Sequence, residues 1–327
     1  MTKNTLIIIT LIIKRTDKFF LLCLLQKPHV SWHDFARGLE TDISRIKMYE
    51  SVLFHYPDKS PASEPYKEEL QYIKQHRSFS VFPYDALGTI PEPEIGFDES
   101  CHLHFLLHNN KRLFFPESWN QRQIIDYYTN TLSIENILET EDKYLRKTPH
   151  RYQSAGHKIE EGDILVDAGS AEGLFTLDNI EHVSKAIIIE CDKKWENPLK
   201  ETFKPYMDKV SLVFKMLGEK DSEDTISLST ILQGTNPSPT FIKMDIEGAE
   251  ANTIESSISF FKCSDRILKI SCCTYHNNDD FARIFNVFKQ LNCKTECSDG
   301  YMLIYDYAEK QPYFRHGLIR ATITPQR

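Results

Sequence analysis

The sequence predicts an α/β protein whose second half forms a mostly parallel sheet, and three observations support this. An apolar run at 164–166 ends in Asp167 and leads into a glycine-bearing turn, after which apolar residues return at helical spacing. A second apolar run at 185–189 ends in Glu190. Further strand-like runs then alternate with helical patterns to about residue 291. This alternation is typical of a Rossmann-like sheet covered by helices on both faces.

Length and composition are compatible with a large folded protein. The chain has 327 residues, of which 41% are hydrophobic and 26% charged, so we expect about two domains with a buried core. We place the boundary between an N-terminal, mostly helical α+β region (1–145) and a C-terminal domain (146–327). The formal net charge of -8 provides no general attraction to nucleic acid or anionic lipid. We therefore expect no nucleic-acid partner.

The cysteines indicate reduced thiols and a cytoplasmic protein. No two of them form a C-x-x-C pair, and several lie in or beside apolar strands, as small buried hydrophobic residues do. Cys293 and Cys297 could hold zinc together with a distant histidine, but we expect no metal. The eight cysteines are at 23, 101, 191, 263, 272, 273, 293 and 297.

Two apolar runs begin the chain, Leu6–Ile13 and Phe19–Leu25, with four charged residues between them. Each run is well short of the roughly 20 residues that a membrane-spanning helix needs. A secretory signal and attachment to a membrane surface are alternatives. We favour packing on the body of the protein, or an unfolded leader.

Helical spacing of apolar residues predicts a helix over 31–56 and a second helix from Ser63, with Pro65 in its first turn. Residues 79–82 are expected to form a short strand and 91–94 a loop. A helical region should follow from Pro116 to about residue 145.

A β-hairpin is predicted at 101–115, with strands at 101–108 and 112–115 joined through Asn109 and Asn110. His102, His104 and His108 invite a metal site. We favour a solvated strand face, because no acid or cysteine accompanies them at ligand spacing.

The C-terminal domain should contain seven strands. Five parallel strands are expected to be followed by an antiparallel hairpin of 294–297 and 301–305 around Asp299-Gly300. This arrangement resembles the sheet of class I methyltransferases. The later strands are expected at 210–214, 241–245 and 267–271, and the helices at 195–207, from about 250 to 262, and at 281–291.

The turn after the first of these strands is suited to binding a nucleoside. Gly169 and Gly173 allow the backbone to approach a ligand closely, and Glu190 can accept both hydroxyls of a ribose. A dinucleotide needs G-x-G-x-x-G and a place for its pyrophosphate, which Glu172 would repel. Acidic residues suit a cationic ligand such as S-adenosylmethionine instead. A turn without any ligand is the alternative.

The segments Asp167–Gly173 and Phe241–Glu250, together with Glu190, resemble the FkbM-type methyltransferase family, whose hallmark is K-x-D-x-E-G-x-E after the fourth strand. The resemblance covers about 145–307. It implies S-adenosylmethionine as methyl donor and usually O-methylation, commonly of a sugar or another small hydroxyl acceptor. At one position the sequence departs from the family, since Ser229 stands where an Asp is usual.

The expected cofactor contacts come from the strand ends and the turns after them. Met216 and Leu217 are placed to line one face of an adenine, and Tyr152 is a contact implied by the resemblance. The full set is Tyr152, Asp167, Gly169, Ser170, Ala171, Glu172, Gly173, Glu190, Cys191, Asp192, Met216, Leu217 and Asp245.

Methyl transfer requires an enzyme that positions the acceptor and removes its proton. The candidate catalytic residues are Asp245, Glu247, His276 and Lys243. Asp245 is equally suited to bind the amino or sulfonium end of the donor. Lys243 either pairs with a carboxylate or binds the acceptor, and His276 is either a base or a loop histidine that caps the next helix.

Two other functional classes stay open. One is an NAD-dependent or nucleotide-sugar enzyme on a similar sheet, and the other is a binding protein whose methyltransferase fold has lost activity.

Overall fold

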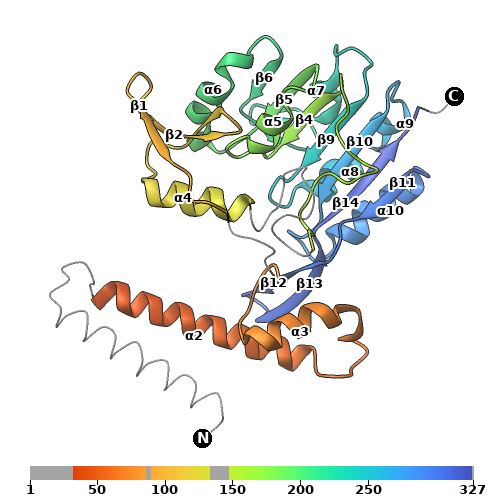
Figure 1. Cartoon of the computed structure of the whole chain (residues 1–327). Helices are drawn as coiled ribbons and strands as arrows, with labels where there is room; N and C mark the ends of the chain where they lie inside the picture. The colour runs from red at the N-terminus through yellow and green to blue at the C-terminus, as the bar shows by residue number, and fades with distance from the viewer. Residues whose placement is uncertain (1–31, 86–89, 133–146, 326–327) are drawn as a thin grey trace, which may run out of the picture. The chain divides into compact units, whose positions relative to one another are not determined.

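The computed structural model describes residues 32–85, 90–132 and 147–325. The chain divides into two units, one of residues 1–83 with 303–314 and one of residues 84–302 with 315–327 (Figure 1). The apolar runs at 6–13 and 19–25 and the last part of the expected helical region after Pro116 lie outside the described residues. No helix in the described ranges is long and apolar enough to cross a membrane.

The first unit pairs two helical segments with a β-hairpin. Aromatic rings join them, since Phe314 stacks on Tyr66 with centroids 4.3 Å apart and meets Tyr56 edge-on at 4.9 Å. The helices expected over 31–56 and from Ser63 are confirmed. The elements are α2 (Trp32–His55), η1 (Glu64–Tyr66), α3 (Lys67–His76), β12 (Tyr301–Asp306) and β13 (Gln311–His316).

The prediction of a short strand at 79–82 is wrong. These residues form no strand, although the carbonyl of Val81 accepts a hydrogen bond from the N–H of Leu303 at 2.9 Å. The apolar side chains that suggested a strand instead contact the hairpin, as Phe79 does at Tyr305.

The second unit is built on a seven-stranded sheet of order β11-β14-β10-β9-β4-β5-β6. Neighbouring strands from β10 to β6 run parallel, and β14 runs antiparallel to both β10 and β11. The predicted Rossmann-like fold with an antiparallel last hairpin is therefore confirmed. The strands are β4 (Ile164–Ala168), β5 (Lys185–Ile189), β6 (Val210–Val213), β9 (Thr240–Met244), β10 (Leu268–Cys273), β11 (Lys294–Cys297) and β14 (Leu318–Ile323).

The partner of β11 differs from the prediction. Residues 301–305 were expected to return beside 294–297, but β11 pairs with β14, and β12 pairs with β13. Gly300 does turn the chain, with φ +88°. It leads out of the sheet, so residues 298–317 form an insertion between the last two strands of the sheet.

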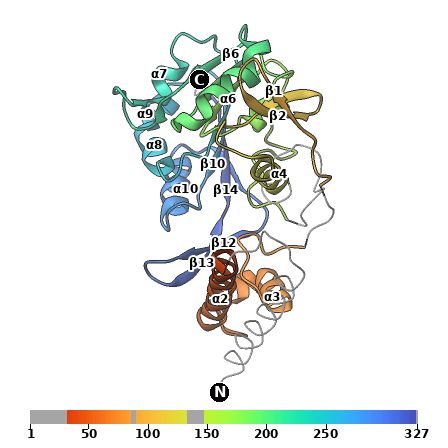
Figure 2. The ribbon, with the colours of Figure 1, turned by 90° about the vertical axis from the view of Figure 1, so that its left-hand side faces the viewer.

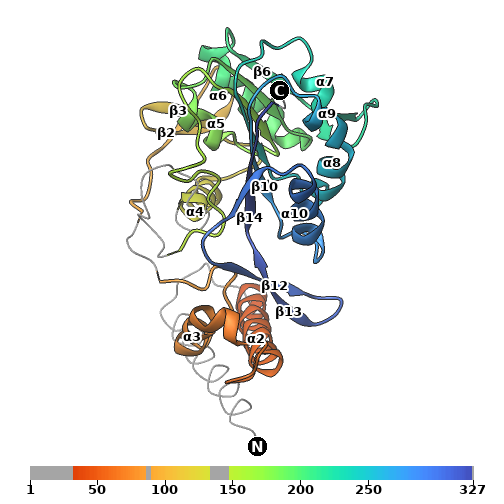
Figure 3. The same ribbon diagram turned by 90° about the vertical axis from the view of Figure 1, so that its right-hand side faces the viewer.

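Helices cover both faces of this sheet (Figures 1 and 3). Successive side chains of a strand point to opposite faces, so Phe241 joins the core under α5 and α6 while Ile242 joins the core under α8 and α10. The elements around the sheet are α4 (Gln121–Asn130), α5 (Leu174–Asn179), η3 (Lys193–Trp195), α6 (Glu196–Phe203), η4 (Lys204–Tyr206), β7 (Met216–Leu217), β8 (Thr225–Ile226), α7 (Leu228–Leu232), α8 (Glu250–Ser256), α9 (Ile258–Lys262) and α10 (Asp280–Gln290).

A three-stranded sheet of β1 (Ile95–Asp98), β2 (Leu103–His108) and β3 (Lys111–Phe114) lies beside α6 (Figure 2). The predicted hairpin is confirmed, with positive φ at both turn residues, Asn109 and Asn110. The strand β1 was not predicted. The N–H of Phe114 donates to Thr202 of α6 at 3.0 Å, so these strands belong with the large sheet. The domain boundary expected at residue 145 stays a prediction.

The prediction that the histidines of this strand lie on a solvated face is wrong for His108. This side chain is 3% exposed, its Nδ1 lies 2.8 Å from the Tyr128 hydroxyl, and its Nε2 lies 3.2 Å from Asp178. Leu107, whose side chain points to the opposite face of the strand, is 59% exposed. The face that carries Leu106 and His108 packs inward because α4 covers it.

Candidate functional site

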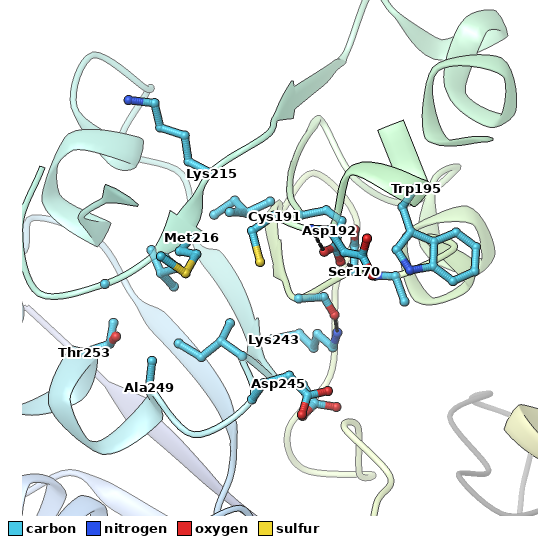
Figure 4. Close-up of a pocket in the computed structure, with 18 of the residues that line it drawn as sticks. Ser170, Cys191, Asp192, Trp195, Lys215, Met216, Lys243, Asp245, Ala249 and Thr253 are labelled. Carbon is cyan, nitrogen blue, oxygen red and sulfur yellow. Dashed lines mark hydrogen bonds between the residues drawn. The ribbon is translucent and has the colours of Figure 1, made fainter. Parts of the chain in front are cut away.

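A cavity of about 750 Å³ lies at the carboxyl ends of β4, β5 and β9. Its walls come from the turns that follow these strands, from β7, and from the first residues of α8 (Figure 4). In a parallel sheet the carboxyl ends of neighbouring strands meet at one edge, which is where open α/β sheets bind ligands.

Gly169 lets two of these turns meet. Its φ is +70°, and a Cβ atom there would lie 1.7 Å from the carbonyl oxygen of Asp245. Gly173, at φ +82°, faces the ring of Phe203 and precedes α5. Neither position has room for a side chain, so the glycine spacing is fixed by the close approach of the two turns and by the packing of α6.

Glu190 joins the glycine turn to the turn after β5. One carboxylate oxygen accepts the N–H of Ala171 at 2.8 Å, and the other accepts the N–H of Asp192 at 2.7 Å. The side chain is 8% exposed and lines the cavity. Gly169 and Glu190 therefore belong to one wall of the same cavity.

The opposite part of the wall is apolar. Ile189, Met216 and Leu217 line it together with Ala249 and Thr253. Figure 4 shows Cys191 and Met216 on one side of the space and Ala249 and Thr253 on another.

Asp167 lies beneath the glycine turn and does not line the cavity. It is fully buried, one oxygen accepts the hydroxyl of Thr176 at 2.7 Å, and the other lies 3.1 Å from Nζ of Lys243. Lys243 also donates to the carbonyl of Gly169. Burial alone would lower the pKa of Lys243, but the charges of Asp167 and Asp245 raise it above its usual value. The lysine is therefore a paired ammonium.

Asp245 faces the cavity from the end of β9. Its Oδ2 accepts the hydroxyl of Tyr152 at 2.8 Å and lies 3.2 Å from Nε2 of His150, and its Oδ1 accepts the hydroxyl of Tyr275 at 3.2 Å. Burial raises the pKa of Asp245, but the hydrogen bond and charge of His150, with the charge of Lys243, outweigh it and hold the pKa well below its usual range. Asp245 is thus a persistent carboxylate, a weak base and a good partner for a cation.

His276 lies beside this carboxylate but is not part of the cavity lining. Its Nδ1 is 2.9 Å from the fully buried Glu250, and its Nε2 is 3.6 Å from both Asp245 and Glu247. Burial lowers the pKa of His276, but the hydrogen bond and charge of Glu250 raise it to a net value above the usual one.

Glu250 fixes the turn between β9 and α8. Its two oxygens accept the N–H groups of Ile246 at 2.7 Å and Gly248 at 2.9 Å. Within this turn Glu247 has φ +56°, and its side chain is 93% exposed at the cavity.

Residues 178–295 match the family model described as the methyltransferase FkbM domain. This part of the chain is therefore similar to FkbM-type methyltransferases. The resemblance to this family is confirmed: the segment 241–250 lies within the match, and the glycine turn 167–173 directly precedes it. No curated protein matches the sequence.

Many solved structures are similar to part of the chain, among them the following three. A methyltransferase FkbM from Methylobacillus flagellatus KT has 18% identity and a TM-score of 0.39, with 52% of this chain and 46% of that chain covered. A SAM-dependent O-methyltransferase from Thermotoga maritima has 11% identity and a TM-score of 0.32, with 52% and 62% covered. Trm5b from Pyrococcus abyssi has 14% identity and a TM-score of 0.36, with 80% and 70% covered. The chain thus spans less than half the length of the FkbM structure.

Most of the residues predicted for the FkbM-type site do gather around the cavity. Asp167, Gly173 and His276 are the exceptions, and they lie directly behind its wall. The predicted residues that line it are Tyr152, Gly169, Ser170, Ala171, Glu172, Glu190, Cys191, Asp192, Met216, Leu217, Lys243, Asp245 and Glu247.

Among the lining residues that sequence reasoning missed, five bear directly on the chemistry of the site. His150 and Tyr275 contact Asp245, as described above. Trp119, Tyr127 and Trp195 form an aromatic group, with the Trp119 and Trp195 rings 5.3 Å apart and the Tyr127 hydroxyl donating to Glu172 at 2.6 Å. Trp119 lies just before α4 and Tyr127 lies on it, and this helix carries no sequence motif that predicts a site.

Proposed function

We propose that the protein is an S-adenosylmethionine-dependent methyltransferase that methylates a hydroxyl oxygen of a small acceptor such as a sugar or glycan. One observation carries this proposal. The glycine turn, Glu190 and the ionised Asp245 share the walls of one cavity of about 750 Å³, a volume typical of small-ligand sites.

The wall fits the parts of this donor. The carboxylate of Glu190 is suited to the ribose hydroxyls, and the apolar surface of Met216 and Leu217 to an adenine. Asp245 is suited to the positive amino end, because its pKa is held well below the usual range. When bound, the donor supplies a methyl group that its sulfonium charge has already activated.

The glycine turn favours this donor over NAD. The N–H groups of Gly169 and Ser170 point to the carbonyl of Ile189, and that of Gly173 donates to the carbonyl of Ser170. The N–H of Ala171 is bound to Glu190. A pyrophosphate would need these backbone N–H groups, which are already hydrogen-bonded. Glu172, which is 4% exposed, lies beside them and would repel it.

The remaining groups divide into positioning and proton-accepting roles. Lys243 is held by Asp167 and Gly169, which supports a structural role rather than contact with the acceptor. Asp245 is too weak a base to remove a hydroxyl proton efficiently. Glu247, exposed at the cavity, is the carboxylate of this turn that is free to accept it.

The aromatic group of Trp119, Tyr127 and Trp195 supports an acceptor with a ring. It adds a second apolar surface to the cavity, separate from that of Met216 and Leu217. Aromatic rings of this kind stack on the apolar face of a sugar, while hydroxyls reach nearby acids such as Glu172.

Isothermal titration of the full chain with S-adenosylmethionine and with NAD tests the donor. We expect binding of the first and none of the second. Release of labelled methyl to a panel of sugars then separates an enzyme from a binding protein. Binding of NAD without binding of S-adenosylmethionine would overturn the proposal.

A further inference from the structure

Three side chains of different chemical types meet at the edge of the cavity, which two of them, His150 and Asp245, line. His150, Asp245 and Cys273 each offer one ligand atom, and these atoms lie within 4.8 Å of one another. His150 is 3% exposed and Cys273 is fully buried. They come from the segment before β4, the end of β9 and the end of β10, which are distant in the sequence.

The distances between these atoms match a zinc site. Nε2 of His150 lies 3.2 Å from Oδ2 of Asp245 and 3.5 Å from Sγ of Cys273. Tetrahedral zinc with bonds of about 2.0 Å to nitrogen and oxygen and about 2.3 Å to sulfur places these pairs about 3.3 and 3.5 Å apart. We propose that His150, Asp245 and Cys273 bind one Zn²⁺ ion, with a fourth coordination position open to the cavity.

The charges and the surroundings fit this ion. A neutral imidazole, a carboxylate and a thiolate balance the two charges of zinc, and the thiol proton is released to solvent on binding. The ammonium of Lys243 has its own counter-ion in Asp167, at 3.1 Å. The hydroxyls of Tyr152 and Tyr275 donate to Asp245 and orient it, as partners behind metal ligands do.

A neighbouring cluster, Asp245 with Glu250 and His276, is a weaker candidate. Nδ1 of His276 faces Glu250 and Nε2 faces Asp245, so one ion cannot bind to both sides of the ring. Both oxygens of Glu250 already accept backbone N–H groups. Within the described residues, Cys293 and Cys297 belong to neither of the two candidate metal clusters.

Zinc binding at this site does not depend on the proposed function. A role of the zinc in catalysis does rest on the proposed function. Three protein ligands with an open fourth position are typical of catalytic zinc. With its proton taken up by Glu247, an acceptor hydroxyl would be activated there, because the ion would lower the pKa of the hydroxyl. Its oxygen then bonds to the methyl carbon as the carbon–sulfur bond of the donor breaks, and the electron pair stays on sulfur.

Two adjacent cysteines provide a matched test. Cys272 precedes Cys273 on β10, is also fully buried, and packs on the opposite face of the sheet, near Sδ of Met244. Cys272→Ala and Cys273→Ala remove the same atoms, so their effects on stability should be similar. Only Cys273→Ala removes a proposed ligand.

The full chain is stripped with a chelator, dialysed, and titrated with Zn²⁺ and separately with Co²⁺. We expect one zinc per chain in the wild type and in Cys272→Ala, with a thiolate-to-cobalt absorption band. Cys273→Ala should lose at least tenfold in zinc affinity and lose the band. No stoichiometric zinc in the wild type, or equal zinc binding and equal bands in both variants, would overturn the site. Titration with S-adenosylmethionine is run separately and tests the proposed function alone.

Discussion

The cavity wall and the layer of side chains directly behind it use the same residue types for different purposes. In the wall, Glu190 and Asp245 are carboxylates that face open space. Behind it, Asp167 and Glu250 are fully buried and bound to Lys243, His276 and backbone N–H groups. An acid near a cavity therefore does not by itself indicate a ligand contact. Substitutions behind the wall should change stability, and those in the wall should change binding.

The largest effect is expected for Lys243→Met. It leaves Asp167 buried and charged without its partner, which costs about 3 to 5 kcal/mol of unfolding free energy for a buried pair. Urea unfolding measures this. The double variant Asp167→Asn with Lys243→Met removes both charges and should recover part of the loss. An equal loss in the double variant would show that the ion pair is not the cause.

Acid should lower the unfolding free energy because it protonates His157 in the unfolded chain, whereas in the folded protein this side chain is buried and only 3% exposed. Burial lowers the pKa of His157 from 6.5 to about 4. Between these values the unfolded chain binds a proton that the folded chain does not, so stability falls as the pH drops from 6.5 towards 4 and is unaffected above 6.5. The loss is roughly 3 kcal/mol.

Unfolding of the wild type and His157→Phe at a series of pH values measures this contribution. The difference between the two proteins isolates His157 from the carboxylates that also titrate in acid. Parallel pH curves would contradict the assignment.

Gly169→Ala should cost roughly 2 to 4 kcal/mol, because the added Cβ meets the carbonyl of Asp245 at 1.7 Å and the turn must move. Gly162→Ala is the matched control. Gly162 also has positive φ, at +86°, but nothing lies within 4 Å of its Cβ position. Its cost should be only about 1 kcal/mol, from the backbone conformation. Thermal unfolding distinguishes the two, and equal costs would rule out the close approach of the two turns as the cause.

The last effect, and the smallest in free energy, is expected for Glu190→Gln and is measured as a change in binding. Affinity for S-adenosylmethionine should fall about tenfold, or about 1.4 kcal/mol, because the amide accepts ribose hydroxyls less well. Glu219→Gln serves as control, since Glu219 lines the same cavity but is exposed. Isothermal titration that gives equal affinities for both variants would remove Glu190 from the donor site.

The parts of the site that the sequence reveals are those encoded locally. The turn 167–173, Glu190 and the segment 241–250 each carry their spacing within a few residues, so strand ends and ligand contacts could be assigned from them. The sequence does not by itself distinguish Asp167 from Asp245, because burial is decided by helices that pack from elsewhere. Both acids follow apolar strand residues.

The parts that were missed depend on contacts between distant segments. β14 pairs with β11 across an insertion of twenty residues, 298–317, whose own Asp299-Gly300 turn and apolar strands resemble a closing hairpin. His150 and Cys273 meet only through the sheet, 123 residues apart. Trp119 and Tyr127 reach the cavity because α4 packs on the sheet, and no local pattern shows this.

A crystal structure of the full chain with S-adenosylhomocysteine tests the central claim most directly. The account predicts that the ribose hydroxyls lie within hydrogen-bond distance of Glu190, with adenine against Met216 and the amino group at Asp245. Density for the ligand outside this cavity, or a cavity closed by side chains in the presence of ligand, would contradict it.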